Sequence, residues 1–199
     1  MSRRSTYALI ILILLMIGIP TWIQFHWAVS GYQGNRTDHF DGQRFHNLTP
    51  YTPKSIADII TWRLNRHVPP WPKQVKNGHY PIPSAQIQSP KTVSVTFINH
   101  ATLLIQMKGL NILTDPIWQK RASPLSWFGP KRVRAPGIKM DQLPPIDLII
   151  ISHNHYDHMD IPTLLALQKR FHPIVLTGLG NDDFLHKQGI NRVKGLDWW

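Results

Sequence analysis

An apolar run that leads directly into four potential metal ligands constrains this chain more than any other feature. Residues 146–151 are mostly β-branched and follow two prolines, which predicts a short buried strand. The strand enters a loop that carries His153, His155, Asp157 and His158. Asp160 and Pro162 then have the character of an N-cap and a first-turn proline for a helix over residues 161–170. A strand that feeds such a loop predicts a metal site at the strand's end.

The spacing within the loop indicates how the ligands would be shared. His153 and His155 are two residues apart, so a locally extended backbone sends both imidazoles to the same side. Asp157 and His158 are adjacent and are expected to point in different directions. This pattern suits two neighbouring metal ions better than one, and imidazole and carboxylate are ordinary zinc ligands. A polar, histidine-rich surface loop is the alternative interpretation.

The segment resembles the H-x-H-x-D-H motif of the metallo-β-lactamase superfamily. Six further segments resemble one branch, the N-acyl-phosphatidylethanolamine-hydrolysing phospholipase D and its bacterial relatives: residues 97–107, 113–116, 121–124, 129–132, 143–147 and 196–199. Phe40-Asp41-Gly42, with Phe45 and Asn47, is similar to the lead-in segment of that branch. The resemblance covers roughly residues 38–199.

The resemblance implies an α/β (α+β) fold over residues 91–199, the N-terminal half of a metallo-β-lactamase αββα sandwich. In that superfamily a third histidine, a bridging aspartate and a last histidine come from the second half, and none can be assigned here. We therefore expect an incomplete domain with one sheet face and an edge uncovered. It would be a fragment, one part of a split gene with a complementary C-terminal chain, or a degraded copy.

The resemblance also implies roles for the motif residues. His153 and His155 would hold a first zinc ion, and Asp157 and His158 would hold a second one and serve as the catalytic residues. The two ions would activate water for attack on a phosphodiester, most simply that of an N-acylated phosphatidylethanolamine. The alternatives are a lactonase or nuclease on the same scaffold, or an inactive remnant.

Two polar residues at the ends of predicted strands are candidates for supporting the ligands. His100 and Asp115 follow or end their strands on what would be the same rim as the motif, and zinc ligands need such support. Ordinary strand-end polarity is the alternative. Asn99 stands where the family usually has a glycine before that histidine, so the local turn is expected to differ.

Residues 1–30 predict a signal anchor or a signal peptide. Arg3 and Arg4 precede an unbroken apolar run, and Tyr7–Val29 is long enough to span a membrane. An uncleaved anchor would place the bulk of the chain on the outer, extracytoplasmic side. Cleavage near Ser30 would instead give a secreted protein.

Charge and composition narrow the choice of partner. The net charge is +11, there is no cysteine, and all 11 acidic residues are aspartates. A disulfide framework and a thiolate metal site are therefore excluded. The basic balance predicts an anionic partner, and without a zinc finger or RNP motif we expect a phospholipid substrate and a membrane surface, with no nucleic acid.

The remaining segments predict a short extension and a set of regular elements. Residues 31–90 form an extension in which Ser55 and Asp58 resemble a capping pair of one helix. Further elements are strands over 93–98, 101–107, 110–114, 173–177 and 191–194, and a helix over 181–188. The long loop 116–143 is rich in basic and aromatic residues, so it either meets phosphate-bearing lipid or covers a satellite hydrophobic cluster.

Overall fold

The computed structural model describes residues 3–27, 31–49, 52, 54–78 and 81–198. Helix α1 (Arg3–Trp27) belongs to one compact unit, Met1–Ser30, and a second unit comprises Gly31–Trp199. Among the described residues no helix has the length and apolar character of a membrane span, so the expected span gains no support. The expected cleavage site near Ser30 lies outside the described residues. Attachment to the outer side of a membrane stays a prediction.

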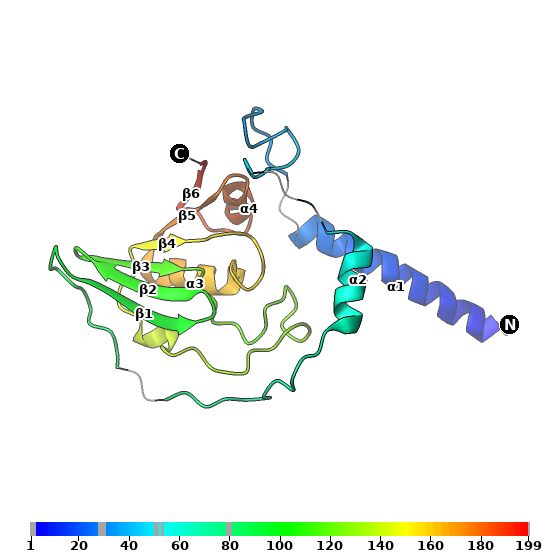
Figure 1. The fold of residues 1–199 in the computed structure, drawn as a ribbon, viewed down its shortest axis with the longest axis horizontal. Helices are drawn as coiled ribbons and strands as arrows, with labels where there is room; N and C mark the ends of the chain where they lie inside the picture. Colours follow the sequence, from blue (N-terminus) through cyan, green and yellow to red (C-terminus); the bar gives the residue numbers. More distant parts are fainter. Residues whose placement is uncertain (1–2, 28–30, 50–51, 53, 79–80, 199) are drawn as a thin grey trace. The chain divides into compact units, whose positions relative to one another are not determined.

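The second unit is built on a six-stranded mixed sheet (Figure 1). The strands follow one another in sequence order, with β1–β3 antiparallel and β3–β6 parallel. Their bounds are β1 Val93–Asn99, β2 Thr102–Met107, β3 Leu110–Thr114, β4 Leu148–Ile150, β5 Ile174–Gly178 and β6 Val193–Leu196. The predicted α/β class is thus present as a mixed sheet that agrees with part of the metallo-β-lactamase fold.

Local sequence explains the turns and crossovers of this sheet. Lys108 and Gly109 both have positive φ, 48° and 79°, which is what a two-residue hairpin turn between β2 and β3 requires. Parallel neighbours need a long connection, and a helix supplies it after β4 and after β5. The β3–β4 connection is the long loop predicted over residues 116–143, in which the one helical turn is η1 (Met140–Gln142).

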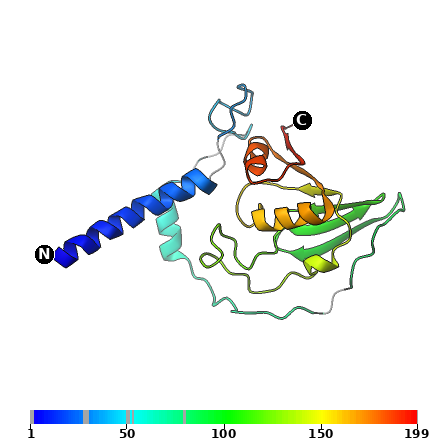
Figure 2. The same ribbon diagram turned by 180° about the vertical axis from the view of Figure 1, so that it is seen from behind.

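The core lies between one face of the sheet and two helices, α3 (Ile161–Phe171) and α4 (Asn181–Lys187). Figure 2 shows α3 lying across the sheet. Alternate strand residues point into this layer, and the most deeply buried apolar ones are Leu104, Leu113, Ile149 and Val175. From α3, Leu164 and Leu167 meet them at 1% and 0% exposure.

Asp160 precedes α3 at the predicted N-cap position, but its carboxylate serves another purpose. It accepts hydrogen bonds from the backbone N–H groups of Trp118 (3.2 Å) and Gln119 (3.1 Å) and from the Thr163 hydroxyl (2.6 Å). Burial raises the pKa of this carboxyl group. Asp160 therefore ties the long loop to the start of α3.

The opposite face of the sheet carries apolar side chains that remain exposed. Ladder partners place Val95, Ile105, Ile112, Leu148 and Ile174 in one row across five strands. Val95 and Ile174, at the two ends of the row, are 59% and 42% exposed. The uncovered sheet face that the resemblance implied is present among the described residues.

The extension contains helix α2 (Ile56–Asn65), which begins with the predicted capping box of Ser55 and Asp58. No residue of α2 is buried. The lead-in segment before it docks elsewhere: His39 stacks on Trp198 at 4.6 Å between ring centroids, and its Nε2 lies 2.7 Å from Asp197 Oδ1. The lead-in segment is thus held against the end of β6.

Candidate metal centre

The candidate site lies where the parallel strands β3 and β4 end. Asp115 follows β3, and Ser152 begins the motif loop after β4. The backbone N–H of Asp115 donates to Ile150 O at 2.9 Å, so the two strand ends remain in register. Ligand-binding residues in open α/β sheets gather at such carboxyl ends.

His100 reaches the same place from the turn between β1 and β2. His100 and Asp115 are two of four non-glycine residues with positive φ in the described structure, at 44° and 37°. Such conformations cost about 1–3 kcal/mol each and cluster at functional sites. The turn that was expected to differ because Asn99 replaces glycine is formed with His100 itself in the left-handed region. Asn99 instead donates a side-chain hydrogen bond to Ile117 O at 3.2 Å.

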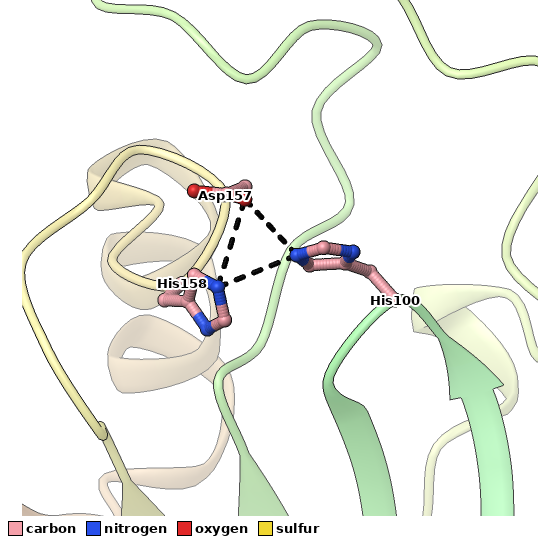
Figure 3. A group of neighbouring side chains, drawn as sticks. All are labelled: His100, Asp157 and His158. Carbon is pink, nitrogen blue, oxygen red and sulfur yellow. Dashed lines mark hydrogen bonds and ion pairs between the residues drawn. The ribbon is translucent and has the colours of Figure 1, made fainter. Parts of the chain in front are cut away.

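Three side chains converge on one point (Figure 3). His100 Nε2 lies 3.0 Å from Asp157 Oδ2 and 3.3 Å from His158 Nε2. His158 Nε2 and Asp157 Oδ2 are 3.6 Å apart. Ligand atoms at 2.0–2.1 Å from a tetrahedral zinc ion are about 3.3 Å from one another. The donor atoms of His100, Asp157 and His158 therefore fit a single divalent ion, and we refer to them as the metal-binding group.

Asp115 stands directly behind this group. Its Oδ2 lies 2.9 Å from His158 Nδ1 and accepts the Ser152 hydroxyl at 2.8 Å. Its Oδ1 accepts the Ser152 backbone N–H at 2.7 Å. A carboxylate that accepts Nδ1–H leaves the Nε2 lone pair of His158 free and aimed at the ion position, as in carboxylate–histidine–zinc arrangements.

His153 and His155 form a second pair of nitrogen donors beside the metal-binding group. His153 Nε2 and His155 Nδ1 are 3.0 Å apart, and the His153 and His158 ring centroids are 4.0 Å apart. Burial, and then the neighbouring His158 and His155, lower the pKa of His153. A lowered pKa keeps the imidazole in the neutral form that binds metals.

Two features of the site differ from the sequence-based expectations. Asp157 and His158 do not point in different directions, because residues 155–158 form a tight turn in which His158 N–H donates to His155 O at 2.9 Å. The turn folds the two neighbours toward each other. His100, expected to support the ligands, supplies one of the three converging donor atoms.

Ser152 was not predicted as part of the site. Its hydroxyl lies within 2.8 Å of Asp115 Oδ2 and 2.9 Å of His153 Nδ1, so it links the two histidine groups. Its place between the strand and the first motif histidine was the only sequence signal for this role.

Comparison with known proteins supports the family. Residues 110–199 match the family model described as the beta-lactamase superfamily domain. An uncharacterized protein of Mycobacterium tuberculosis (strain ATCC 25618 / H37Rv) is 38% identical over 108 residues, which are 53% of this chain and 29% of that protein.

One further relative and one solved structure bear names that describe an activity. The N-acyl-phosphatidylethanolamine-hydrolyzing phospholipase D 1 of Caenorhabditis elegans is 35% identical over 153 residues, covering 72% of this chain and 43% of the relative. Among solved structures, an isothiocyanate hydrolase from Delia radicum gut bacteria is 26% identical, with a TM-score of 0.43 over 52% of this chain and 40% of the other. The chain spans less than half the length of each of these relatives.

Proposed function

Because residues 110–199 match the beta-lactamase superfamily domain and the motif resembles that of the metallo-β-lactamases, we propose that the chain provides the metal-binding half of a zinc-dependent phosphodiesterase. Its reaction would be a phospholipase D-type hydrolysis of an N-acylated phosphatidylethanolamine. The relative from Caenorhabditis elegans with that activity in its name supports the substrate class. A lactonase or nuclease on the same scaffold is the second candidate.

The observation that carries this proposal is the convergence of His100, Asp157 and His158 in front of the Asp115 carboxylate. Two nitrogens and one oxygen suit zinc, and the separations of 3.0, 3.3 and 3.6 Å suit one ion. His153 and His155 would provide two donors for a second ion. Bound zinc would supply Lewis-acid polarisation of the phosphoryl group and a lowered pKa for bound water.

The residues of the chain would perform the remaining tasks. Asp115 fixes the tautomer and the ring orientation of His158 through the 2.9 Å contact at Nδ1. Ser152 fixes Asp115 in turn with its backbone N–H and its hydroxyl. Asp157 adds a negative charge to the metal-binding group, which raises its affinity for a divalent cation over that of imidazole ligands alone. These residues set the position at which a substrate phosphoryl group would be held.

Metal content is the first test of this proposal. The full chain is loaded with zinc, passed through a desalting column and analysed by inductively coupled plasma mass spectrometry, together with His158→Ala and the control His186→Ala. His186 is exposed on α4, far from the motif in sequence. We expect stoichiometric zinc in the wild type and the control, and loss of zinc from His158→Ala. Equal zinc in all three proteins would refute the assignment.

Substrate class is tested with the zinc-loaded chain, alone and with a complementary C-terminal chain if one is encoded. N-acyl-phosphatidylethanolamine in vesicles, bis(p-nitrophenyl) phosphate and a homoserine lactone separate the candidates. Release of N-acylethanolamine supports the first proposal. Turnover of the lactone alone would replace it with the second candidate. Zinc binding without turnover of any of the three compounds would indicate an inactive remnant.

A further inference from the structure

A cavity of about 430 Å³ opens directly beside the metal-binding group, because His100 and Asp157 form part of its wall. This volume is within the usual range of small-molecule sites. Apolar side chains supply much of the lining, with Trp71 and Phe97 the largest. Four cations complete it, and we call them the cationic wall: Lys120, Lys131, Arg132 and Arg134.

None of the four cations of the cationic wall forms an ion pair with a carboxylate in the described structure. Every ion pair that joins two described side chains has a histidine as its cation, and none involves lysine or arginine. The side chains of Lys120, Lys131 and Arg134 are exposed and make no hydrogen bond to a described residue. Three positive charges next to an apolar surface therefore remain available to an anion.

Backbone pairing holds the segments that carry these cations beside one another. Arg132 N–H donates to Lys120 O at 3.0 Å, and Arg121 and Lys131 form an antiparallel bridge. The Arg132 guanidinium is half-buried and donates to Gln119 O at 2.8 Å and to Ile117 O at 3.2 Å. The backbone of the cationic wall is therefore a pair of hydrogen-bonded segments, which we call the ribbon.

The segment that carries Trp71 is attached to the same ribbon. Val75 N–H donates to Val133 O at 2.7 Å, and the Asn77 side chain donates to Ala135 O and Pro136 O, both at 3.0 Å. The extension therefore contributes an aromatic side chain, Trp71, to the lining of the cavity.

We propose that this cavity binds a phosphate ester with an apolar arm, its anion against the exposed cations Lys120, Lys131 and Arg134 and its arm against Trp71 and Phe97. The inference rests on the proposed function, since His100 and Asp157 belong to both sites. It adds the residues that would select an anionic ester over a neutral one. Arginine and lysine both bind phosphate oxygens well, arginine through two parallel N–H bonds.

Binding without chemistry tests the cavity. The full chain is kept in excess chelator, and isothermal titration compares dihexanoylphosphatidic acid with dihexanoylglycerol and with inorganic phosphate. The variant Lys131→Gln/Arg134→Gln is matched by Lys169→Gln/Lys187→Gln, which removes two exposed charges from α3 and α4. We expect the first variant to bind dihexanoylphosphatidic acid at least about tenfold more weakly, with the control near wild type.

Each outcome decides one point. Equal weakening in the two double variants, or none in either, would overturn the proposal. Inorganic phosphate bound as tightly as dihexanoylphosphatidic acid would refute the role of Trp71 and Phe97 and leave a free-phosphate site. The chain could bind the anion through the cationic wall and yet neither retain zinc nor hydrolyse any ester. That result would support the binding role of the cavity and refute the proposed function. Zinc-dependent turnover, together with anion binding that is unchanged in Lys131→Gln/Arg134→Gln, would refute the binding role of the cavity but not the proposed function.

Discussion

Replacement of Asp115 by asparagine tests the link between the sheet and the metal-binding group. The carboxylate receives three contacts, from the Ser152 backbone N–H (2.7 Å), the Ser152 hydroxyl (2.8 Å) and His158 Nδ1 (2.9 Å). Asparagine has nearly the same shape and tolerates the positive φ of 37° at this position. The backbone should therefore stay in place.

The electrostatic consequence of Asp115→Asn is larger than the steric one. If the amide oxygen accepts the Ser152 N–H, the amide NH2 group faces His158 Nδ1 and donates to it. His158 then carries its proton on Nε2, the atom that faces the ion position. Restoring the productive tautomer, together with the lost bond to a charged group, costs about 1.5–3 kcal/mol. This corresponds to a loss of metal affinity of about 10- to 100-fold.

The measurement is zinc affinity by competition with a chromogenic chelator, accompanied by the melting temperature without metal. Asp147→Asn is the matched control, because its Oδ2 accepts the Asn111 N–H at 2.8 Å at the opposite end of β4. We expect the control to lose stability but to keep the affinity of the wild type for zinc. Unchanged affinity in Asp115→Asn, or an equal loss in the control, would refute the reasoning.

Two further predictions concern the core and the lead-in segment. Leu164→Ala should lower the free energy of unfolding by about 2–5 kcal/mol in urea titrations, because Leu164 is 1% exposed. The control Leu165→Ala, at a residue that is 38% exposed, should lower it by less than about 1 kcal/mol. Equal losses in the two variants would contradict the position of the core. Hydrogen bonds to Asp197 and then to Asp38 raise the pKa of His39 above its ordinary value of 6.5. Protonated His39 therefore stabilises the docking of the lead-in segment. This stabilisation should be complete below pH 6.5 and should be lost as the pH rises through the raised pKa. Hydrogen-exchange protection of residues 36–46 should fall over that range in the wild type and become insensitive to pH in His39→Gln; a flat wild-type profile would contradict this role.

Strands were predictable where local pattern and pairing agree. The three strands of the antiparallel meander lie within one residue of their predicted bounds, because apolar alternation and the Lys108–Gly109 turn point to the same register. The apolar run 146–151 was predicted as one strand, but only Leu148–Ile150 forms it. Ile146 and Ile151 lie outside the strand but are both only 2% exposed. The apolar run therefore indicates which residues are buried, and only some of these residues pair with neighbouring strands.

The membership of the site was less predictable than its location. The motif identifies candidate ligands in the sequence. Which of their side chains converge depends on two backbone features that no local sequence pattern specifies. One is the turn over residues 155–158, which brings Asp157 and His158 together. The other is the left-handed conformation of His100, which is 58 positions from His158 in sequence and 3.3 Å from it in space. Tertiary structure, and not sequence spacing, brings His100 into the metal-binding group.

The use of charge in this chain connects its structure to its proposed function. The two buried aspartates, Asp115 and Asp160, accept hydrogen bonds from backbone N–H groups and hydroxyls, and Asp115 also contacts a histidine. The chain has 11 aspartates against 22 lysines and arginines, and in the described structure no aspartate forms an ion pair with a lysine or an arginine. Exposed basic side chains contribute little to stability when unpaired, and the same charges beside an apolar cavity favour an anionic ligand. The buried aspartates and the apolar core therefore stabilise the fold, while Lys120, Lys131 and Arg134 make no ion pair with a described residue and are the cations that we propose to bind an anionic substrate.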